Sequence, residues 1–237
     1  MGRLKAVFFD LGGTLLDARS GESSLMKVVE ATRLRYGLDI PSTELYWRIA
    51  VNMRRYEQAQ SRRWTPIREL LAEAFDEEMA RLGIRVESRD AEWFLKTNTA
   101  EYRRGSRLAT GAMDILRGAK QLILHIGVLS DVDDAWASML IENLRIRPLI
   151  DSITTSESVG VGKPNPKIFT VALRKAGCEP QEAVHAGDSL EKDVRGAKGV
   201  GMRAVHISPT PSPEADFQLK SIAELMPLLR KLTEGGL

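Results

Sequence analysis

The chain has 237 residues, of which 43% are hydrophobic and 28% are charged, with a formal net charge of +2. This composition is typical of a globular protein and excludes a disordered or fibrous chain. The mild charge gives no support to nucleic-acid binding, and no run approaches the ~20 apolar residues of a membrane helix. The N-terminal apolar run AVFF has only a strand's length, and Cys178, the single cysteine, cannot form an internal disulfide, so we expect a cytoplasmic protein.

The first predicted element is a buried strand over Leu4–Phe9, which is followed by Asp10 and a turn of Gly12, Gly13 and Thr14. A carboxylate just past the end of a strand points into the crevice where open α/β sheets bind ligands. The two glycines allow a tight turn whose backbone N–H groups can hold a phosphate. Asp10 is therefore a candidate nucleophile or metal ligand, although an ordinary strand–helix turn gives the same local pattern.

A long central segment interrupts this pattern. It shows no strand-like alternation, and its apolar residues recur at helical spacing, as at Leu70 and Ala74. We therefore predict a helical insertion over residues 19–104, placed within an α/β core formed by residues 1–18 and 105–237. An insertion at this point follows the strand-end crevice directly, and we expect it to act as a lid.

The predicted insertion is rich in arginine, notably at Arg19, Arg54, Arg55, Arg62 and Arg63. A solvated, salt-bridged helix surface explains such residues. The alternative is that some face the crevice, where a planar guanidinium can grip a carboxylate or a second phosphate of the substrate. Helical spacing alone leaves both faces open.

After the insertion, short apolar strands alternate with helix-length segments, which indicates a doubly wound parallel sheet. Four further strands are predicted at Leu122–Leu129, Ser152–Thr155, Ala183–Ala186 and Ala204–Ile207. Helices are predicted at Asp134–Asn143, Pro166–Ala176, Leu190–Gly199 and Ile222–Leu232. The predicted fold class is therefore α/β, with a Rossmann-like core and one inserted helical domain.

Two positions after the second strand are candidates for substrate binding. The hydroxyl of Ser130 and the N–H of Asp131 can bind a phosphoryl oxygen, although Ser130 also suits the N-cap of the next helix. Further on, Lys163 lies on a loop stiffened by Pro164 and Pro166. A lysine held there can keep a nucleophilic carboxylate ionised, and an idle exposed lysine is the alternative.

A second acidic pair follows a later strand in the run AVHAGDSLEKDV, where Asp188 ends the strand and Asp193 lies in the next turn. If this strand neighbours that of Asp10, the carboxylates can hold a hard cation, which prefers oxygen ligands. Asp193 can orient Lys163 or the waters of the metal. A solvent-facing acid in the first turn of a helix is the alternative.

The three histidines each lie within a predicted strand, and their spacing is not that of a metal site. We therefore expect them to be core or sheet-face residues whose polar atoms find hydrogen-bond partners. They are His125, His185 and His206.

Taken in order, the runs FFDLGGTLLD, VLSD, GKPNPKIF and AGDSLEKDV resemble the four sequence motifs of the haloacid dehalogenase (HAD) superfamily of hydrolases. The resemblance covers the core from both ends and leaves the insertion as a cap of the family's C1 type. It implies a Rossmann-like core, an Mg²⁺ cofactor and the nucleophile Asp10, which would form an aspartyl-phosphate. Lys163 would pair with this nucleophile, and Thr14 and Ser130 would contact the phosphoryl group.

The same resemblance implies a metal site. Asp10, Asp188 and the main-chain carbonyl of Gly12 would be ligands, and Asp193 would support them. Small phosphorylated or anionic molecules are then the expected partners, with no role for nucleic acid or membrane. The sequence leaves the oligomeric state open.

One position departs from the family pattern. Phosphatases of the superfamily carry a second Asp two positions after the nucleophile as general acid and base, and here Gly12 occupies that position. Loss of such a proton donor costs ~10²–10⁴ in rate. Asp17, a cap residue or a bound water can stand in, or the substrate has a good leaving group.

The function we expect is therefore that of an Mg²⁺-dependent phosphatase that acts through Asp10. Gly12 leaves two other readings open. One is a dehalogenase-like or phosphonatase-like hydrolase, with Lys27 as the nearest candidate for a Schiff base. The other is a binding protein without turnover.

Overall fold

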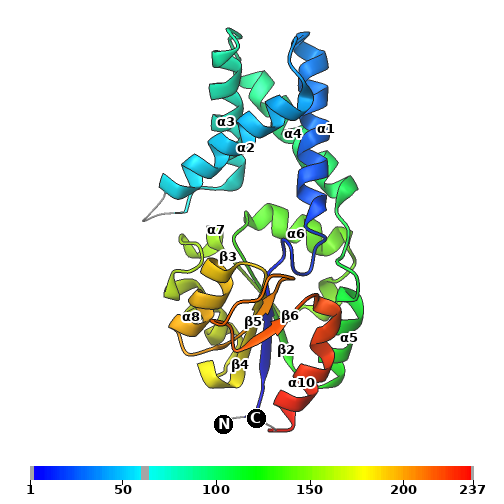
Figure 1. Ribbon diagram of the computed structural model, residues 1–237, viewed down its shortest axis with the longest axis vertical. Helices are drawn as coiled ribbons and strands as arrows, with labels where there is room; N and C mark the ends of the chain where they lie inside the picture. The colour runs from blue at the N-terminus through cyan, green and yellow to red at the C-terminus, as the bar shows by residue number, and fades with distance from the viewer. Residues whose placement is uncertain (1–2, 60–63, 236–237) are drawn as a thin grey trace. The chain divides into compact units, whose positions relative to one another are not determined.

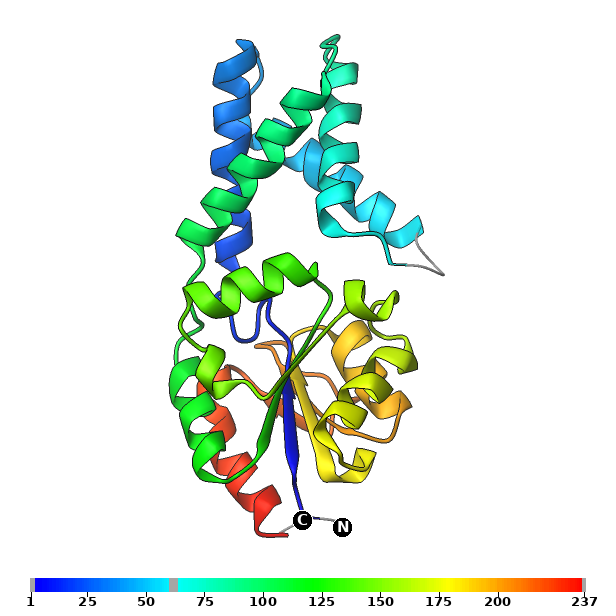
Figure 2. The same cartoon turned by 180° about the vertical axis from the view of Figure 1, so that it is seen from behind.

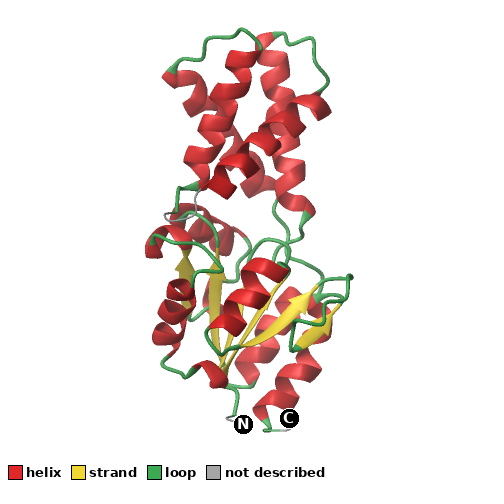
Figure 3. Ribbon diagram, turned by 60° about the vertical axis from the view of Figure 1, so that its left-hand side comes forward, coloured by secondary structure: helices red, strands yellow, loops and turns green. Residues whose placement is uncertain are grey.

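The computed structural model describes residues 3–59 and 64–235. The chain divides into two compact units, an α/β unit of Met1–Ala18 with Arg107–Leu237 and a helical unit of Arg19–Ser106. Every described strand belongs to the α/β unit, whereas the described part of the helical unit contains only helices and their connections (Figure 3). The strand–helix alternation is thus interrupted once, directly after the first strand.

The α/β unit is built on a six-stranded parallel sheet in the order β3-β2-β1-β4-β5-β6 (Figure 1). The strands are β1 (Ala6–Phe9), β2 (His125–Ser130), β3 (Ser152–Thr155), β4 (Ala183–Gly187), β5 (Arg203–Ile207) and β6 (Phe217–Leu219). The chain builds the sheet outward from β1 on one side and from β4 on the other, so the topological switch lies between these two strands. The prediction of a Rossmann-like α/β core is confirmed.

Helices cover both faces of the sheet (Figures 1 and 2). On one side α8 packs against β2 and β3, and on the other α5 and α10 pack together. The helices of this unit are α5 (Ala112–Gln121), α6 (Asp134–Asn143), α7 (Ser156–Val159), α8 (Pro166–Ala176), α9 (Gly196–Gly199) and α10 (Leu225–Thr233). Shorter helical turns occur at η1 (Arg147–Leu149), η2 (Pro180–Glu182), the π-helical η3 (Leu190–Arg195) and η4 (Ile222–Glu224).

The sheet core explains why the strands form where they do. All four residues of β1 are buried, because a parallel strand covered by helices on both faces must be apolar throughout. Phe8 belongs to a buried cluster with Ile168 and Phe169 of α8 and with Val194 of η3. Burial of each large side chain contributes about 1.5–3 kcal/mol to folding, so this cluster fixes α8 and η3 on the sheet.

Several element bounds differ from the prediction, and two of these differences have a clear local cause. The sequence pattern predicts a strand from Leu122, whereas β2 begins at His125, because α5 ends in a tight turn. In that turn Ile123 has a φ of 56°, and the N–H of Leu124 donates to the carbonyl of Ala119 at 3.2 Å. The edge strand β6 is not predicted, since its three residues are only half-buried and too few to show alternation.

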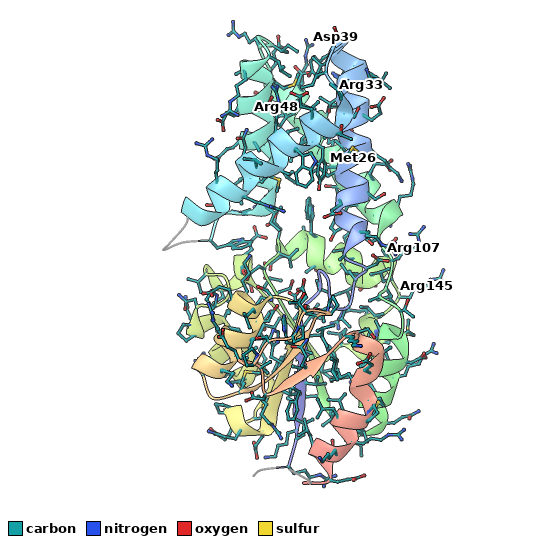
Figure 4. All side chains as sticks on the ribbon, in the orientation of Figure 1. Met26, Arg33, Asp39, Arg48, Arg107 and Arg145 are labelled. Carbon is teal, nitrogen blue, oxygen red and sulfur yellow. The ribbon has the colours of Figure 1, made fainter. Side chains whose placement is uncertain are left out.

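The helical unit contains α1 (Arg19–Tyr36), α2 (Ser42–Ala59), α3 (Ile67–Arg81) and α4 (Ser88–Gly105). Each of the pairs α1–α4, α1–α2, α2–α3 and α3–α4 is in contact. In the centre the rings of Phe75 and Phe94 stack with centroids 4.3 Å apart. Arg48, labelled in Figure 4, pairs at 3.0 Å with the buried Glu78. Across the described ranges, no helix combines the length and apolar character that crossing a bilayer requires.

Candidate active site

Asp10 and Asp188 follow the ends of two neighbouring strands. Phe9 of β1 pairs with Ala186 of β4, and the N–H of Asp10 donates to the carbonyl of Ala186 at 3.0 Å. Because both strands run in the same direction, the carboxylates that follow them lie at the same edge of the sheet. Carboxylate oxygens of Asp10, Asp188 and Asp193 all lie within 4.8 Å of one another.

A buried ammonium lies among these carboxylates. The Nζ atom of Lys163 donates to Oδ1 of Asp10 at 2.7 Å, to Oδ1 of Asp193 at 2.5 Å and to the carbonyl of Leu129 at 3.4 Å. The lysine side chain is only 2% exposed. An idle surface lysine is therefore excluded, and Lys163 bridges two of the three carboxylates.

Burial and charge set the protonation states of this bridge. Burial lowers the pKa of Lys163, but the carboxylates of Asp10 and Asp193 outweigh that effect and raise the pKa well above its ordinary value. Burial raises the pKa of Asp193, but Lys163 and His185 reverse the effect and hold the pKa well below the usual range. The ammonium and the Asp193 carboxylate therefore both stay charged at neutral pH.

The carboxyl groups of Asp10 and Asp188 both have a raised pKa, so their ionised forms are less favoured than that of Asp193. Burial, together with repulsion from Asp193, raises the pKa of Asp10 by more than Lys163 and the hydroxyl of Ser130 lower it. Burial and repulsion from Asp10 and Asp193 raise the pKa of Asp188 to about 6. Because the side chain of Asp188 is exposed, solvent weakens this repulsion without removing it.

The charges of the cluster can be counted. Three carboxylates face one ammonium, which leaves two negative charges in excess when all four groups are ionised. All the available side-chain ligands are oxygens, which Mg²⁺ prefers. The donor set and its excess charge therefore fit a hard divalent cation.

The turn after Asp10 shows why glycine is required at position 13. Gly13 has a φ of +73°, and a Cβ there would lie 2.4 Å from Oδ2 of Asp188. Thr14 follows in the same turn and is buried, and its hydroxyl has no hydrogen-bond partner among the described residues. A buried hydroxyl is normally satisfied, so Thr14 is available to a ligand. Its contact with a phosphoryl group stays a prediction.

Ser130 closes β2 next to the nucleophile candidate. It is buried, and its hydroxyl hydrogen-bonds to the carboxylate of Asp10, which favours the ionised form. The alternative role as the N-cap of α6 is wrong, because Asp133 occupies that position. Ser130 therefore faces the same cluster as Lys163.

The side chain of Asp131 makes contacts that the sequence pattern does not predict. Its Oδ1 atom accepts the backbone N–H of Lys163 at 2.8 Å and the hydroxyl of Ser156 at 2.5 Å. The sequence pattern pointed only to its N–H group as a possible phosphate donor. The side chain instead ties the loop after β2 to the loop that carries Lys163.

Asp193 lies on the inner side of η3 and is 1% exposed. Its Oδ2 atom accepts the N–H of Ser189 at 2.9 Å, and its Oδ1 atom lies 2.8 Å from Nε2 of His185. The alternative of a solvent-facing acid is therefore wrong. His185 belongs to this cluster, and the signal for it was a histidine inside the apolar strand AVHAG, where a polar ring needs a partner.

The other two histidines match the expectation for sheet residues. His125 hydrogen-bonds to Ser152 at 2.8 Å. His206 contacts the side chain of Gln218 at 3.0 Å and the carbonyl of Asp188 at 3.1 Å. Both rings have polar partners, and neither places a ring nitrogen on a carboxylate of the cluster.

The departure at Gly12 involves three positions: Gly12 itself, Asp17 as the candidate stand-in for the second Asp, and Lys27 as the candidate Schiff-base lysine. Gly12 is exposed, and a Cβ at this position would meet no atom within 4 Å. The N–H of Asp17 donates to the carbonyl of Arg107 at 3.0 Å, which joins the two segments of the α/β unit. Lys27 lies in the helical unit, 3.6 Å from Glu101.

The predicted role of the arginines stays a prediction. Arg54 and Arg55 are exposed on α2, and Arg55 lies 3.9 Å from Glu77. Arg19 is the first residue of α1 and is exposed. Arg62 and Arg63 lie outside the described residues.

Comparison with known proteins gives a family match over most of the chain. The model of the haloacid dehalogenase-like hydrolases matches residues 4–201. The glyceraldehyde 3-phosphate phosphatase of Methanopyrus kandleri is 37% identical over 108 residues, which cover 42% of this chain and 46% of that protein. The haloacid dehalogenase-like hydrolase domain-containing protein 3 of Bos taurus is 36% identical over 135 residues, 53% of each chain. These two matches span about half the length of the relatives.

A third relative aligns over nearly the whole chain. The glyceraldehyde 3-phosphate phosphatase of Pyrococcus furiosus is 25% identical over 226 residues, which cover 94% of this chain and 89% of that protein. The whole-length match includes both the α/β unit and the helical unit.

Solved structures show the same fold at low identity. A HAD hydrolase of Bacillus subtilis bound to magnesium gives a TM-score of 0.79 at 16% identity, covering 97% of this chain and all of that one. A HAD phosphatase of Thermococcus onnurineus gives 0.70 at 23% identity, with 95% and 98% covered. The L-2-haloacid dehalogenase of Xanthobacter autotrophicus gives 0.71 at 18% identity, with 96% and 98% covered. These neighbours include both phosphatases and dehalogenases, so the fold alone does not choose between the two reactions.

Proposed function

Because the chain belongs to the haloacid dehalogenase-like hydrolase family, we propose that it is an Mg²⁺-dependent phosphatase in which Asp10 accepts the phosphoryl group. The observation that carries this proposal is the cluster of Asp10, Asp188 and Asp193 around the buried ammonium of Lys163. We further propose that the α/β unit is the hydrolase core and that the helical unit is its cap.

The proposed reaction has two steps. A carboxylate oxygen of Asp10 attacks phosphorus, and the new P–O bond forms as the bond to the leaving oxygen breaks. The leaving oxygen departs with the bonding electrons and takes up a proton. Water then attacks the aspartyl-phosphate, which releases inorganic phosphate and restores the carboxylate. The ammonium of Lys163 lowers the pKa of Asp10 and orients its carboxylate, and Ser130 and Thr14 supply hydroxyl groups for the phosphoryl oxygens.

The metal would be held by Asp10, Asp188 and the main-chain carbonyl of Gly12, with Asp193 as the supporting carboxylate. When bound, Mg²⁺ supplies charge that offsets the negative phosphoryl oxygens. The excess negative charge of the cluster and the raised pKa of Asp188 support a cation at this position. The magnesium-bound relative from Bacillus subtilis supports the same choice of ion.

The substrate class follows from the relatives and from Gly12. Two relatives are named glyceraldehyde 3-phosphate phosphatases, which supports a small phosphorylated metabolite. The absence of a carboxyl group at position 12 favours substrates whose leaving oxygen needs little protonation, such as acyl and aryl phosphates. The named relatives favour a triose phosphate as substrate, whereas Gly12 favours an acyl phosphate such as acetyl phosphate. The ratio of the two turnover rates therefore tests which of these considerations decides the substrate class.

The proposal is tested with p-nitrophenyl phosphate, with Mg²⁺ and with a chelator. Asp10→Asn should abolish turnover, and the chelator should abolish it in the native protein. Asp114→Asn is a matched control, because Asp114 is an exposed acid in the first turn of α5. Turnover that survives Asp10→Asn or chelation would rule out the mechanism. Halide release from a 2-haloacid, without phosphate release, would identify the dehalogenase alternative instead.

A further inference from the structure

His185 lies in the middle of β4, and its side chain is fully buried. Its Nε2 atom lies 2.8 Å from Oδ1 of Asp193. An ionised carboxylate only accepts hydrogen bonds, so the imidazole N–H is the donor. The same oxygen accepts the ammonium of Lys163 at 2.5 Å. One oxygen atom is therefore shared between the imidazole and the lysine that contacts the nucleophile candidate.

Neighbouring elements hold the imidazole of His185 in place. β4 pairs with β1 on one edge and with β5 on the other, and the ring packs edge-on against Phe169 with centroids 5.6 Å apart. The carboxylate of Asp193 is pressed against the end of the same strand, because a Cβ at Gly187 would lie 2.1 Å from its Cγ. The strand backbone thus places His185 at a fixed distance from Asp193.

A packing role alone does not explain a histidine here. Its Nδ1 atom is buried and has no hydrogen-bond partner in the described part of the chain. An unsatisfied buried polar atom destabilises the folded state, and an apolar side chain of similar size would avoid that cost. The gain from histidine must therefore come from the other ring atom, which meets Asp193.

From these contacts we propose that His185 is a positioning residue that orients Asp193, and through it aims the ammonium of Lys163 at Asp10. The terminal torsion of an aspartate side chain is broad, so its partners decide where each oxygen points. The N–H of Ser189 fixes Oδ2 of Asp193, and the imidazole fixes Oδ1. Without the imidazole, the carboxylate can rotate and draw the ammonium away from the nucleophile. The proposal rests on the proposed role of Asp10 in phosphoryl transfer.

The first test compares His185→Gln with His185→Met. The two side chains have similar shape, but only glutamine offers an N–H near the position of Nε2. With p-nitrophenyl phosphate and saturating Mg²⁺, His185→Met should lower kcat by about 10- to 100-fold, because small misplacements of reacting groups have effects of this size. KM should change little, and His185→Gln should retain most of the activity.

His125 provides the matched control. It lies on the neighbouring strand β2, its ring centroid is 6.1 Å from that of Phe8, and its Nε2 atom bonds to Ser152 rather than to a carboxylate. His125→Met should therefore leave kcat and KM as they are in the native protein. Equal losses in both His185 variants, or no loss in either, would overturn the proposal.

The second test needs no turnover and no metal. In ¹⁵N-labelled protein with a chelator present, the buried ammonium of Lys163 should give slowly exchanging N–H signals, assigned by their loss in Lys163→Met. These signals should shift or broaden in His185→Met and persist in His185→Gln. Unchanged signals in His185→Met would overturn the proposal. If the His185→Met variant does not fold, His185→Leu takes its place in the same measurement. A native protein without phosphatase activity would refute the proposed function, while the ammonium signals would still decide the role of His185.

Discussion

The carboxylate of Asp131 accepts the backbone N–H of Lys163 at 2.8 Å, so the catalytic candidate Lys163 is held at both ends. Its backbone is tied to the loop after β2, and its ammonium is tied to Asp10. The hydroxyl of Ser156 donates to the same Asp131 oxygen at 2.5 Å and brings α7 into the connection. The position of the ammonium therefore depends on a side chain that is remote from it in sequence.

This relationship predicts the effect of substitutions at Asp131. Asp131→Ala removes the acceptor for the Lys163 N–H and should lower kcat for p-nitrophenyl phosphate by about tenfold or more. Asp131→Asn keeps an oxygen in the same place and should have a smaller effect. Steady-state kinetics of the two variants make the comparison, and equal losses would show that the charge of Asp131, not its acceptor geometry, matters.

Gly12→Asp should add a general acid to the site. The structure leaves room for the side chain, because a Cβ at position 12 meets no atom within 4 Å. General acid catalysis contributes ~10²–10⁴ in rate, so turnover of an alkyl phosphate should rise by at least about tenfold relative to acetyl phosphate. Gly12→Asn is the control, since it has the same shape without the proton. A rise in the asparagine variant as well would refute the explanation.

The raised pKa of Asp188 predicts that the stability of the metal-free protein depends on pH. Its pKa is raised from 3.8 to about 6, so between these pH values the folded protein binds more protons than the unfolded chain. The free energy of unfolding should therefore fall as pH rises through this window, and the destabilisation should be complete above it. Urea unfolding in the presence of a chelator at several pH values measures the slope.

Asp188→Asn should flatten that slope, and added Mg²⁺ should stabilise the native protein more above pH ~6 than below it, because ligand carboxylates must be deprotonated. The asparagine variant should respond less to Mg²⁺. A slope that is unchanged in Asp188→Asn would assign the pH dependence to other groups.

The left-handed backbone conformation of Ile123 predicts that a substitution at this position stabilises the protein. It is a β-branched residue at a φ of 56°, and it is 92% exposed. The left-handed conformation costs an ordinary residue about 1–2 kcal/mol, and glycine avoids that cost but loses more entropy on folding. Ile123→Gly should therefore raise the free energy of unfolding by about 0.5–1 kcal/mol in denaturant titrations. Ile123→Ala removes the apolar surface but keeps the strain, so it should gain less.

The sequence was sufficient to locate Asp10 and Asp188, because a carboxylate that follows an apolar run is a local pattern. Lys163 was found through the order of motifs. The contacts of Asp131 and His185 were missed, since they depend on which strands and loops become neighbours. A polar residue in an apolar strand signals that a partner exists, but not which one.

The segment after β4 shows a second limit of sequence reasoning. The spacing predicts one helix over Leu190–Gly199, whereas the structure has a π-helical turn followed by the short α9. The N–H groups of both Asp193 and Val194 donate to the carbonyl of Ser189. The wider turn occurs where Asp193 points inward, and such turns are frequent at functional sites. Hydrophobic spacing does not distinguish it from an ordinary helix start.

The ammonium of Lys163 has three hydrogens, and each already has an acceptor in Asp10, Asp193 and the carbonyl of Leu129. A phosphoryl oxygen can become an acceptor only by replacing one of them. The two carboxylate contacts are short and charged, whereas the contact with Leu129 is 3.4 Å long. In the proposed mechanism, a phosphoryl oxygen that binds this ammonium would therefore replace the main-chain carbonyl of Leu129 as the acceptor of the third hydrogen.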